Sequence, residues 1–325
     1  MVSWGNNMSL TLAEKLNRRD LGVYLIGTTP PKAETDDAAM LGIAQKLLAR
    51  LDNVEYDGVT VYDIQDESAR INAPRPFPFS STREPRQYAE MISATNGKET
   101  LTYRSVAQRN REAFVEWITE TAQVYRQRNV VLVGSPAADV CRLSLSQAYE
   151  AAQQSSLDLH IGGVTIAERH IKKGDEHLRL IEKQKQGCTY FVSQAVYNAQ
   201  ATIDMLTAYA RTCRERHIEP ARIILTFTPC GSPKTLEFMR WLGISIPEAT
   251  GYRILDSDNP ILESQRICYT NLTQILDAVV PLNLPLGLNI ESLTNRKEEI
   301  DAAIALYRLL KARMELSIAQ AKIGM

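Results

Sequence analysis

The sequence contains no apolar run long enough to cross a membrane, and the segment from Met1 to Asp20 lacks the apolar core of a signal peptide. We therefore expect a cytoplasmic protein with no membrane partner. An excess of either charge is also missing, because 37 Lys and Arg residues are balanced by 38 Asp and Glu residues. A net charge of −1 creates no field that attracts nucleic acid, so we expect a small-molecule partner.

Cysteine is scarce and lacks the spacing of a structural site. The five cysteines are an odd number with no CxxC pair, which argues against a disulfide framework and a structural zinc site. His170 and His177 have acidic neighbours, but lysines lie between these two histidines. That spacing is poor for metal ligation, and we expect no metal.

Regular alternation of strand and helix patterns is the main positive feature. Eight apolar, β-branched runs predict strands at 23–27, 58–63, 99–103, 130–133, 157–164, 189–192, 222–228 and 286–290. Helical patterns lie at 10–19, 36–51, 109–126, 143–154, 175–186, 199–217, 235–242, 261–280 and 295–318. Asp36 is placed to cap one helix and Gly187 to end another in the left-handed conformation.

This alternation predicts an α/β fold, a single (β/α)8 TIM barrel domain over residues 1–325. It would have a helix before the first strand and an extra helical insertion before strand 8. No GxGxxG motif follows the first strand, which argues against an open dinucleotide-binding sheet. The proline-rich segment 64–79 is too irregular for an element, and we expect it to lie across a site.

Residues that follow the strands share one rim of such a barrel, where barrels carry their ligand sites. The rim mixes carboxylates, amides and arginines, without a Ser-His-Asp arrangement. This composition suits a hydrogen-bonding heterocycle better than acyl transfer. The rim residues are Gly27, Thr28, Asp63, Gln65, Asp66, Glu67, Tyr103, Arg104, Ser135, Thr165, Glu168, His170, Gln194, Tyr197, Thr228, Glu291, Ser292, Asn295 and Arg296.

Seven short motifs in order give the chain a family resemblance. They are Pro30-Pro31-Lys32, Leu101-Thr102, the apolar run 131–134 ending in glycine, Glu168 with His170, the lysine-rich 183–187, Ser193-Gln194 and Asn295-Arg296. In these motifs the chain resembles methylenetetrahydrofolate reductase, whose catalytic domain is an eight-stranded barrel. The resemblance covers most of the chain.

The resemblance implies an oxidoreductase of one-carbon metabolism that reduces 5,10-methylenetetrahydrofolate or a related pterin with NAD(P)H, through a flavin, FAD. It implies that Gln194 binds the pterin, with Tyr197, Asn295, Arg296 and Thr28 as further substrate contacts. The cofactor contacts that it implies are Thr102, Gly134, Ser135, Glu168, His170 and Lys183.

The sequence also differs from the family pattern. The family's catalytic glutamate, three residues before the Pro-Pro pair, is replaced by Gly27, which cannot transfer a proton. Ser135 stands in place of an aspartate near the flavin, and Glu182 in place of a cation. These replacements count against FAD binding of the usual kind. Asp63 and Glu291 are the candidate replacement acids.

Two functions from different classes therefore stay open. The first is the reductase activity described above, working either through a modified flavin site or by direct hydride transfer from NAD(P)H. The second is a folate-binding barrel without redox chemistry, acting as a regulatory subunit, a partner or a one-carbon transferase. Either form is compatible with a homo-oligomer or a partner subunit. For Glu168 a structural ion pair with Arg169 is an alternative to a role in binding.

Overall fold

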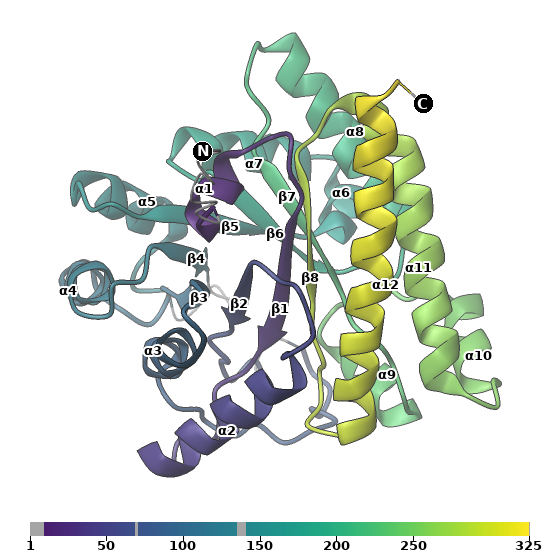
Figure 1. Ribbon diagram of the computed structural model, residues 1–325. Coiled ribbons are helices and arrows are strands. Elements are labelled where there is room, and N and C mark those ends of the chain that lie inside the picture. The colour runs from purple at the N-terminus through teal and green to yellow at the C-terminus, as the bar shows by residue number, and fades with distance from the viewer. Residues whose placement is uncertain (1–9, 69–70, 135–140, 325) are drawn as a thin grey trace, which may run out of the picture.

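The computed structural model describes residues 10–68, 71–134 and 141–324. Eight parallel strands form a closed barrel in chain order, and the last strand pairs with the first, as Ile26 beside Ile290 illustrates (Figure 1). The strands are β1 Val23–Thr28, β2 Gly58–Val61, β3 Thr100–Ser105, β4 Asn129–Val133, β5 His160–Thr165, β6 Tyr190–Ala195, β7 Arg222–Phe227 and β8 Leu286–Ile290. The predicted (β/α)8 barrel is confirmed.

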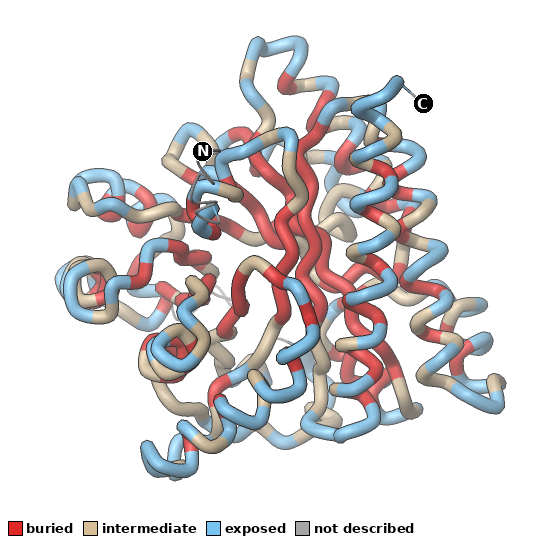
Figure 2. Tube along the Cα trace, in the orientation of Figure 1, coloured by how far each residue is buried: buried red, intermediate tan, exposed pale blue. Residues whose placement is uncertain are grey.

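Helices surround the strands and leave the barrel wall as the most deeply buried part of the chain (Figure 2). The helices are α1 Leu12–Asn17, α2 Asp37–Arg50, α3 Pro85–Asn96, α4 Arg111–Gln123, α5 Leu145–Gln154, α6 Ala167–Lys173, α7 Glu176–Lys185, α8 Ala199–Glu215, α9 Pro233–Trp241, α10 Glu248–Leu255, α11 Pro260–Val279, the 3-10 helix η2 Val280–Leu282 and α12 Lys297–Lys322. In the part of the chain described, no helix has the length and apolar character needed to cross a membrane.

Two predicted helix signals have the expected geometry. The Asp36 side chain accepts a hydrogen bond from the Ala39 amide and so caps α2. Gly187 follows α7 with a φ of 99°, a left-handed conformation that favours glycine. Both signals are local, which is why the sequence alone identified them.

Three helices, α3, α6 and α10, were missed. Helix α6, read as a loop, buries none of its residues, so no apolar period marks it. Helices α3 and α10 have no side-chain hydrogen bond at their N-caps, but the correctly predicted α7 and α12 have none either, so a missing cap does not explain these two. The fifth strand was also predicted too long, because Leu159 turns back to bond the Leu157 carbonyl before β5 begins at His160.

Helix α1 closes the N-terminal end of the barrel. Leu12 and Leu16 pack against Val23 and Leu25 in the same buried cluster as the barrel interior. The buried Arg222 guanidinium, at the start of β7, donates to the carbonyl oxygens of Leu16 and Leu286. These bonds tie the helix to the barrel wall. The opposite, C-terminal end is then the end left for a site, in accord with the general rule for this fold.

Candidate functional site

A carboxyl group stands at the C-terminal end of β8, against the side chains that end β1 and β2. Glu291 follows β8, and the Tyr62 hydroxyl donates a hydrogen bond to its carboxylate. The Asn289 amide donates to the same Tyr62 oxygen over 2.7 Å. A Cβ atom added to Gly27 would lie 2.9 Å from the Glu291 Cβ and 3.0 Å from the Tyr62 ring. Glycine at 27 therefore makes the room that Glu291 and Tyr62 fill, and we call Gly27, Tyr62, Asn289 and Glu291 the acid cluster.

The acid cluster is electrostatically unusual. Burial raises the pKa of Glu291 to about 7, against the opposing effect of the Tyr62 hydrogen bond. Burial, followed by the nearby Glu291 carboxylate, raises the pKa of Tyr62 well above its ordinary value. Tyr103 from β3 packs on Tyr62 with ring centroids 4.7 Å apart, and burial raises its pKa also. A carboxyl with a pKa near neutrality can hold a proton for transfer at physiological pH.

Asp63, the other candidate acid, is more heavily bonded. Its Oδ2 accepts from the Ser105 amide at 2.8 Å and lies 3.5 Å from Arg104 NH1, while its Oδ1 accepts from Gln65. Burial raises the pKa of Asp63 to about 6, although the Ser105 hydrogen bond works in the other direction. Both oxygens thus already hold donors. This carboxylate ties the end of β3 to the segment after β2.

The segment after β2 reaches across the C-terminal rim to α9. The Trp241 indole donates to the Ala73 carbonyl at 3.1 Å. The Arg75 guanidinium lies over the rings of Phe79, Phe238 and Trp241, between 5.2 and 5.6 Å from their centroids. Because β1 and β8 lie between β2 and β7 in the closed barrel, this segment spans the rim beside the acid cluster. Such aromatic contacts hold an arginine without neutralising its charge.

Two predicted ligand contacts converge on the turn after α9. The Gln194 amide donates to the Leu242 carbonyl at 3.3 Å, and the Ser245 amide donates to Glu168 at 3.1 Å. Burial raises the pKa of Glu168. Segments from β5, β6 and the turn 242–245 are therefore brought together, as the shared rim predicts. Their polar groups already have protein partners.

Other residues predicted to contact the cofactor or substrate are held more firmly by contacts within the protein. Thr102 is fully buried and lies with its hydroxyl 2.9 Å from the Gln127 side chain. Lys183 donates to the Val164 carbonyl at 2.6 Å, and burial lowers its pKa. Tyr197 is 2% exposed and donates to the Thr228 carbonyl. The His170 ring packs edge-on against His177. A ligand would have to displace the first three of these bonds to use those groups.

The remaining predicted contacts are spread along the rim. Thr28 ends β1 next to the acid cluster, and its carbonyl accepts from the Tyr62 amide. Asn295 and Arg296 are exposed at the start of α12. Gly134 follows β4, and Ser135 lies outside the described residues. Nothing described here assigns a role to these residues, and their roles stay predictions.

The described residues contain no group of three or more His, Cys, Asp or Glu side chains arranged to hold a metal ion. Sequence reading missed Tyr62, which the structure places at the centre of the acid cluster. The sequence did contain a signal for Tyr62. Side chains alternate along a strand, so Thr60 and Tyr62 lie on the same face of β2 and its continuation. The sequence could not show that this face meets the end of β8.

Fold and rim together define a (β/α)8 barrel with a partly buried acid, Glu291, at its C-terminal end. The chain is 36% identical to an uncharacterized protein from Clostridium thermocellum that binds two copies of 5-methyl-5,6,7,8-tetrahydrofolic acid. That similarity covers 93% of this chain and 100% of the other, with a TM-score of 0.81. This chain belongs to the family of that Clostridium thermocellum protein.

A second solved structure, a 2,3-dimethylmalate lyase of the PEP mutase/isocitrate lyase superfamily, is 11% identical over 98% of this chain and 88% of that one, with a TM-score of 0.48. No protein-family model matches the sequence, and no curated protein does.

Proposed function

We propose that this protein binds a reduced folate of the 5-methyltetrahydrofolate class at the C-terminal end of its barrel. The observation that carries the proposal is the 36% identity, over nearly the whole chain, to a barrel that binds 5-methyltetrahydrofolic acid. Sequence identity at this level over a full barrel supports a shared ligand class. The acid cluster supplies the second support, because it sits where barrels of this kind bind their ligands.

The finer proposal is reduction of 5,10-methylenetetrahydrofolate to the 5-methyl form. Protonation of N10 breaks its bond to the bridging carbon and leaves an iminium at N5. A hydride from NAD(P)H adds to that carbon, which gives 5-methyltetrahydrofolate and NAD(P)+. Glu291 is the proposed proton donor, since its pKa of about 7 leaves much of it protonated at neutral pH. The resemblance to methylenetetrahydrofolate reductase is the basis for this chemistry.

In this proposal Glu291 replaces the family's catalytic glutamate, which is absent here. Its Cβ lies within 2.9 Å of the place where a Gly27 Cβ would stand. A carboxylate from β8 thus occupies the space next to the position that carries the acid in the family. Asp63 is the weaker candidate, because both of its oxygens already accept hydrogen bonds.

Two of the predicted flavin contacts do not fit the cofactor well. The Thr102 hydroxyl is fully buried beside Gln127, and the Lys183 ammonium is bonded to the barrel wall at Val164. A flavin would compete with these buried bonds, which are costly to break. The proposed reaction therefore contains no flavin step, and NAD(P)H is its hydride source.

A non-redox folate-binding barrel is the second candidate. The observation that favours it is the ligand of the Clostridium thermocellum relative, in which the one-carbon unit is already at the methyl level. A protein that stores or hands on this form needs affinity for the folate but no hydride donor. In such a protein, Glu291 serves a methyl transfer or only binds the pterin.

Calorimetric titration of the full chain with 5-methyltetrahydrofolate tests the shared part of both candidates. Absence of binding would refute folate recognition. A second assay then separates the two candidates. It follows the oxidation of NAD(P)H by its absorbance in the presence of 5,10-methylenetetrahydrofolate. Turnover supports the reductase, whereas tight folate binding without turnover supports the non-redox barrel. The absorbance spectrum of the purified protein reports independently on a bound flavin.

A further inference from the structure

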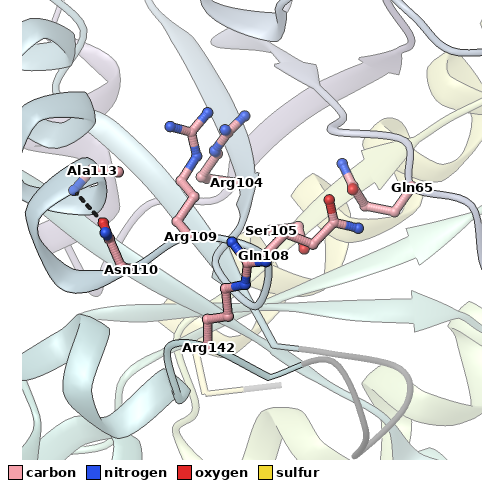
Figure 3. Close-up of a pocket in the computed structure, with 8 residues that line it drawn as sticks. All are labelled: Gln65, Arg104, Ser105, Gln108, Arg109, Asn110, Ala113 and Arg142. Atoms are coloured by element: carbon pink, nitrogen blue, oxygen red, sulfur yellow. Dashed lines mark hydrogen bonds between the residues drawn. The ribbon is translucent and has the colours of Figure 1, made fainter.

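A cavity of about 400 Å³ opens between the ends of β3 and β4 (Figure 3). It is lined by Gln65, Arg104, Ser105, Gln108, Arg109, Asn110, Ala113 and Arg142. Three of these side chains are arginines and none is a carboxylate. We call this cavity the arginine pocket. Arg104 is paired with Asp63 and Glu84, so Arg109 and Arg142 supply the excess positive charge that attracts an anionic group.

Each of the three arginines has at least one guanidinium donor without a partner among the described residues. Neither Arg109 nor Arg142 makes a side-chain hydrogen bond or an ion pair with any residue that the structure describes, and the buried Nε of Arg109 has no partner there. In Figure 3 the guanidinium groups of Arg104 and Arg109 extend in the same direction, and Gln65 approaches from the segment after β2. Unpaired guanidinium donors recognise oxyanions, often with two parallel hydrogen bonds.

Arg104 is the fixed member of the set. It is 8% exposed, its NH1 lies 3.5 Å from both Asp63 and Glu84, and its guanidinium lies over the Trp117 ring. Its buried Nε nonetheless has no hydrogen-bond partner in the described chain. The two carboxylates orient this arginine and leave one donor unused. A buried donor without a partner is costly unless a ligand satisfies it.

Helix α4 adds a partial positive charge to the same cavity. Its N-cap, Asn110, and Ala113 in its first turn both line the pocket, and the Asn110 side chain accepts from the Ala113 amide. A helix of 13 residues presents the positive end of its dipole here. This contribution is secondary to the three guanidinium groups, but it has the same sign.

We propose that the arginine pocket binds an oxyanion carried by the protein's ligand, and that this oxyanion is a carboxylate of the folate glutamate tail. The choice of folate rests on the function proposed above. Chain connectivity supports it: Tyr62 belongs to the acid cluster and Gln65 lines the pocket, and Asp63 between them is bonded to Gln65 and Ser105. A pterin beside Glu291 then directs its anionic tail towards the arginines. The phosphate of a nucleotide is the other source of the same chemistry.

Calorimetry on the full chain with three probes tests the proposal: 5-methyltetrahydrofolate, the tail-free 6-methyltetrahydropterin and inorganic phosphate. The variants are Arg109→Gln and Arg142→Gln, which remove one charge each. Arg111→Gln is the matched control, because Arg111 lies on α4 outside the pocket and bonds Gln154. We expect each pocket variant to weaken folate binding roughly tenfold, the scale of one charge-assisted hydrogen bond, with pterin binding unchanged.

The outcomes separate this proposal from the proposed function. Folate and pterin that both fail to bind the unaltered protein would refute folate recognition. Phosphate binding lost in Arg109→Gln would then still support an oxyanion site and assign it to phosphate. Normal folate binding by both pocket variants, together with phosphate binding equal to that of Arg111→Gln, would overturn the arginine pocket while leaving folate recognition intact.

Discussion

The polar groups on the two sides of the C-terminal rim of the barrel have different environments. At the acid cluster, where β8, β1 and β2 end, burial raises the pKa of the Glu291 carboxyl to about 7 against the effect of the Tyr62 hydroxyl, which donates to it. On the side of β5 and β6, Gln194 and Lys183 bond backbone carbonyls. The first arrangement leaves a group free to exchange a proton, while the second fixes loops and strands.

This contrast changes where function is expected. Three of the seven family motifs lie on the β5 and β6 side, at Glu168 with His170, at 183–187 and at Ser193-Gln194. The proposed proton donor, Glu291, lies on the other side, at a position that no motif includes. In physical terms, a stable barrel wall needs polar groups that are hydrogen-bonded, whereas proton transfer needs a carboxyl that burial keeps partly protonated.

The sharpest way to break the comparison is Glu291→Gln. If the protein is a reductase, the rate of NAD(P)H oxidation with 5,10-methylenetetrahydrofolate should fall by roughly 10²–10⁴-fold, the usual contribution of a general acid. Folate binding should change little, because glutamine keeps the shape. Asp63→Asn should keep the limb of the pH–rate profile that reports the acid. Loss of that limb in Asp63→Asn, with Glu291→Gln unaffected, would transfer the role to Asp63.

Stability against pH provides a test that does not depend on turnover. Folding raises the pKa of Glu291 from 4.5 to about 7, so the folded state holds the proton more tightly than the unfolded state. Stability from this group is fully present below pH 4.5 and is lost as pH rises through about 7, on the order of 3 kcal/mol in total. Asp63, with a pKa raised to about 6, acts in the same direction.

Urea unfolding of the wild type and Glu291→Gln at pH 5 and pH 8 measures this loss. The variant should gain stability relative to the wild type between the two pH values, because glutamine carries no charge to bury. Glu298→Gln, an exposed position on α12, is the control and should show no such gain. An equal difference at both pH values would mean that Glu291 ionises normally.

Gly27→Ala tests the space that the acid cluster fills. The added Cβ would lie 2.9 Å from the Glu291 Cβ and 3.0 Å from Tyr62, and overpacking of this kind costs about 1–3 kcal/mol of stability. In a Glu291→Gly background the same substitution should cost less, since one of the two contacts is gone. Gly42→Ala, whose Cβ meets nothing within 4 Å in α2, should instead stabilise the protein. Equal costs in both backgrounds would show that Gly27 and Glu291 do not compete for space.

The fold could be predicted because each strand and most helices carry their own local pattern. Helix α6 could not, because it buries no residue and therefore has no apolar face to detect. Thr102 shows a different limit: Leu101 and Tyr103 belong to the barrel interior, so alternation places Thr102 on the outer face, where it meets Gln127. The sequence prediction followed the Leu101-Thr102 motif and disregarded this alternation, so it assigned Thr102 to the cofactor.

The sequence predicted some residues of the site, but it did not predict how they are arranged. Glu291 was a candidate because it ends the last strand, and the structure adds Tyr62 and Gly27 as its neighbours. Those contacts join β8 to β1 and β2, from the other end of the chain, and β8 meets them only when the barrel closes. Burial, and with it the raised pKa, follows from that closure and has no local signal.

The smallest expected effect comes from the bonded side of the rim, at Gln194. Its amide already donates to Leu242 at 3.3 Å, a long bond that a pterin could replace at little cost. Gln194→Ala should therefore weaken 5-methyltetrahydrofolate binding by about 1 kcal/mol and leave the melting temperature nearly unchanged. Gln200→Ala, which removes an exposed amide bonded to Asp204 on α8, is the control for calorimetry. If Gln194→Ala lowers the melting temperature but not the affinity, Gln194 only holds the turn after α9, and the division between a reactive and a structural side becomes complete.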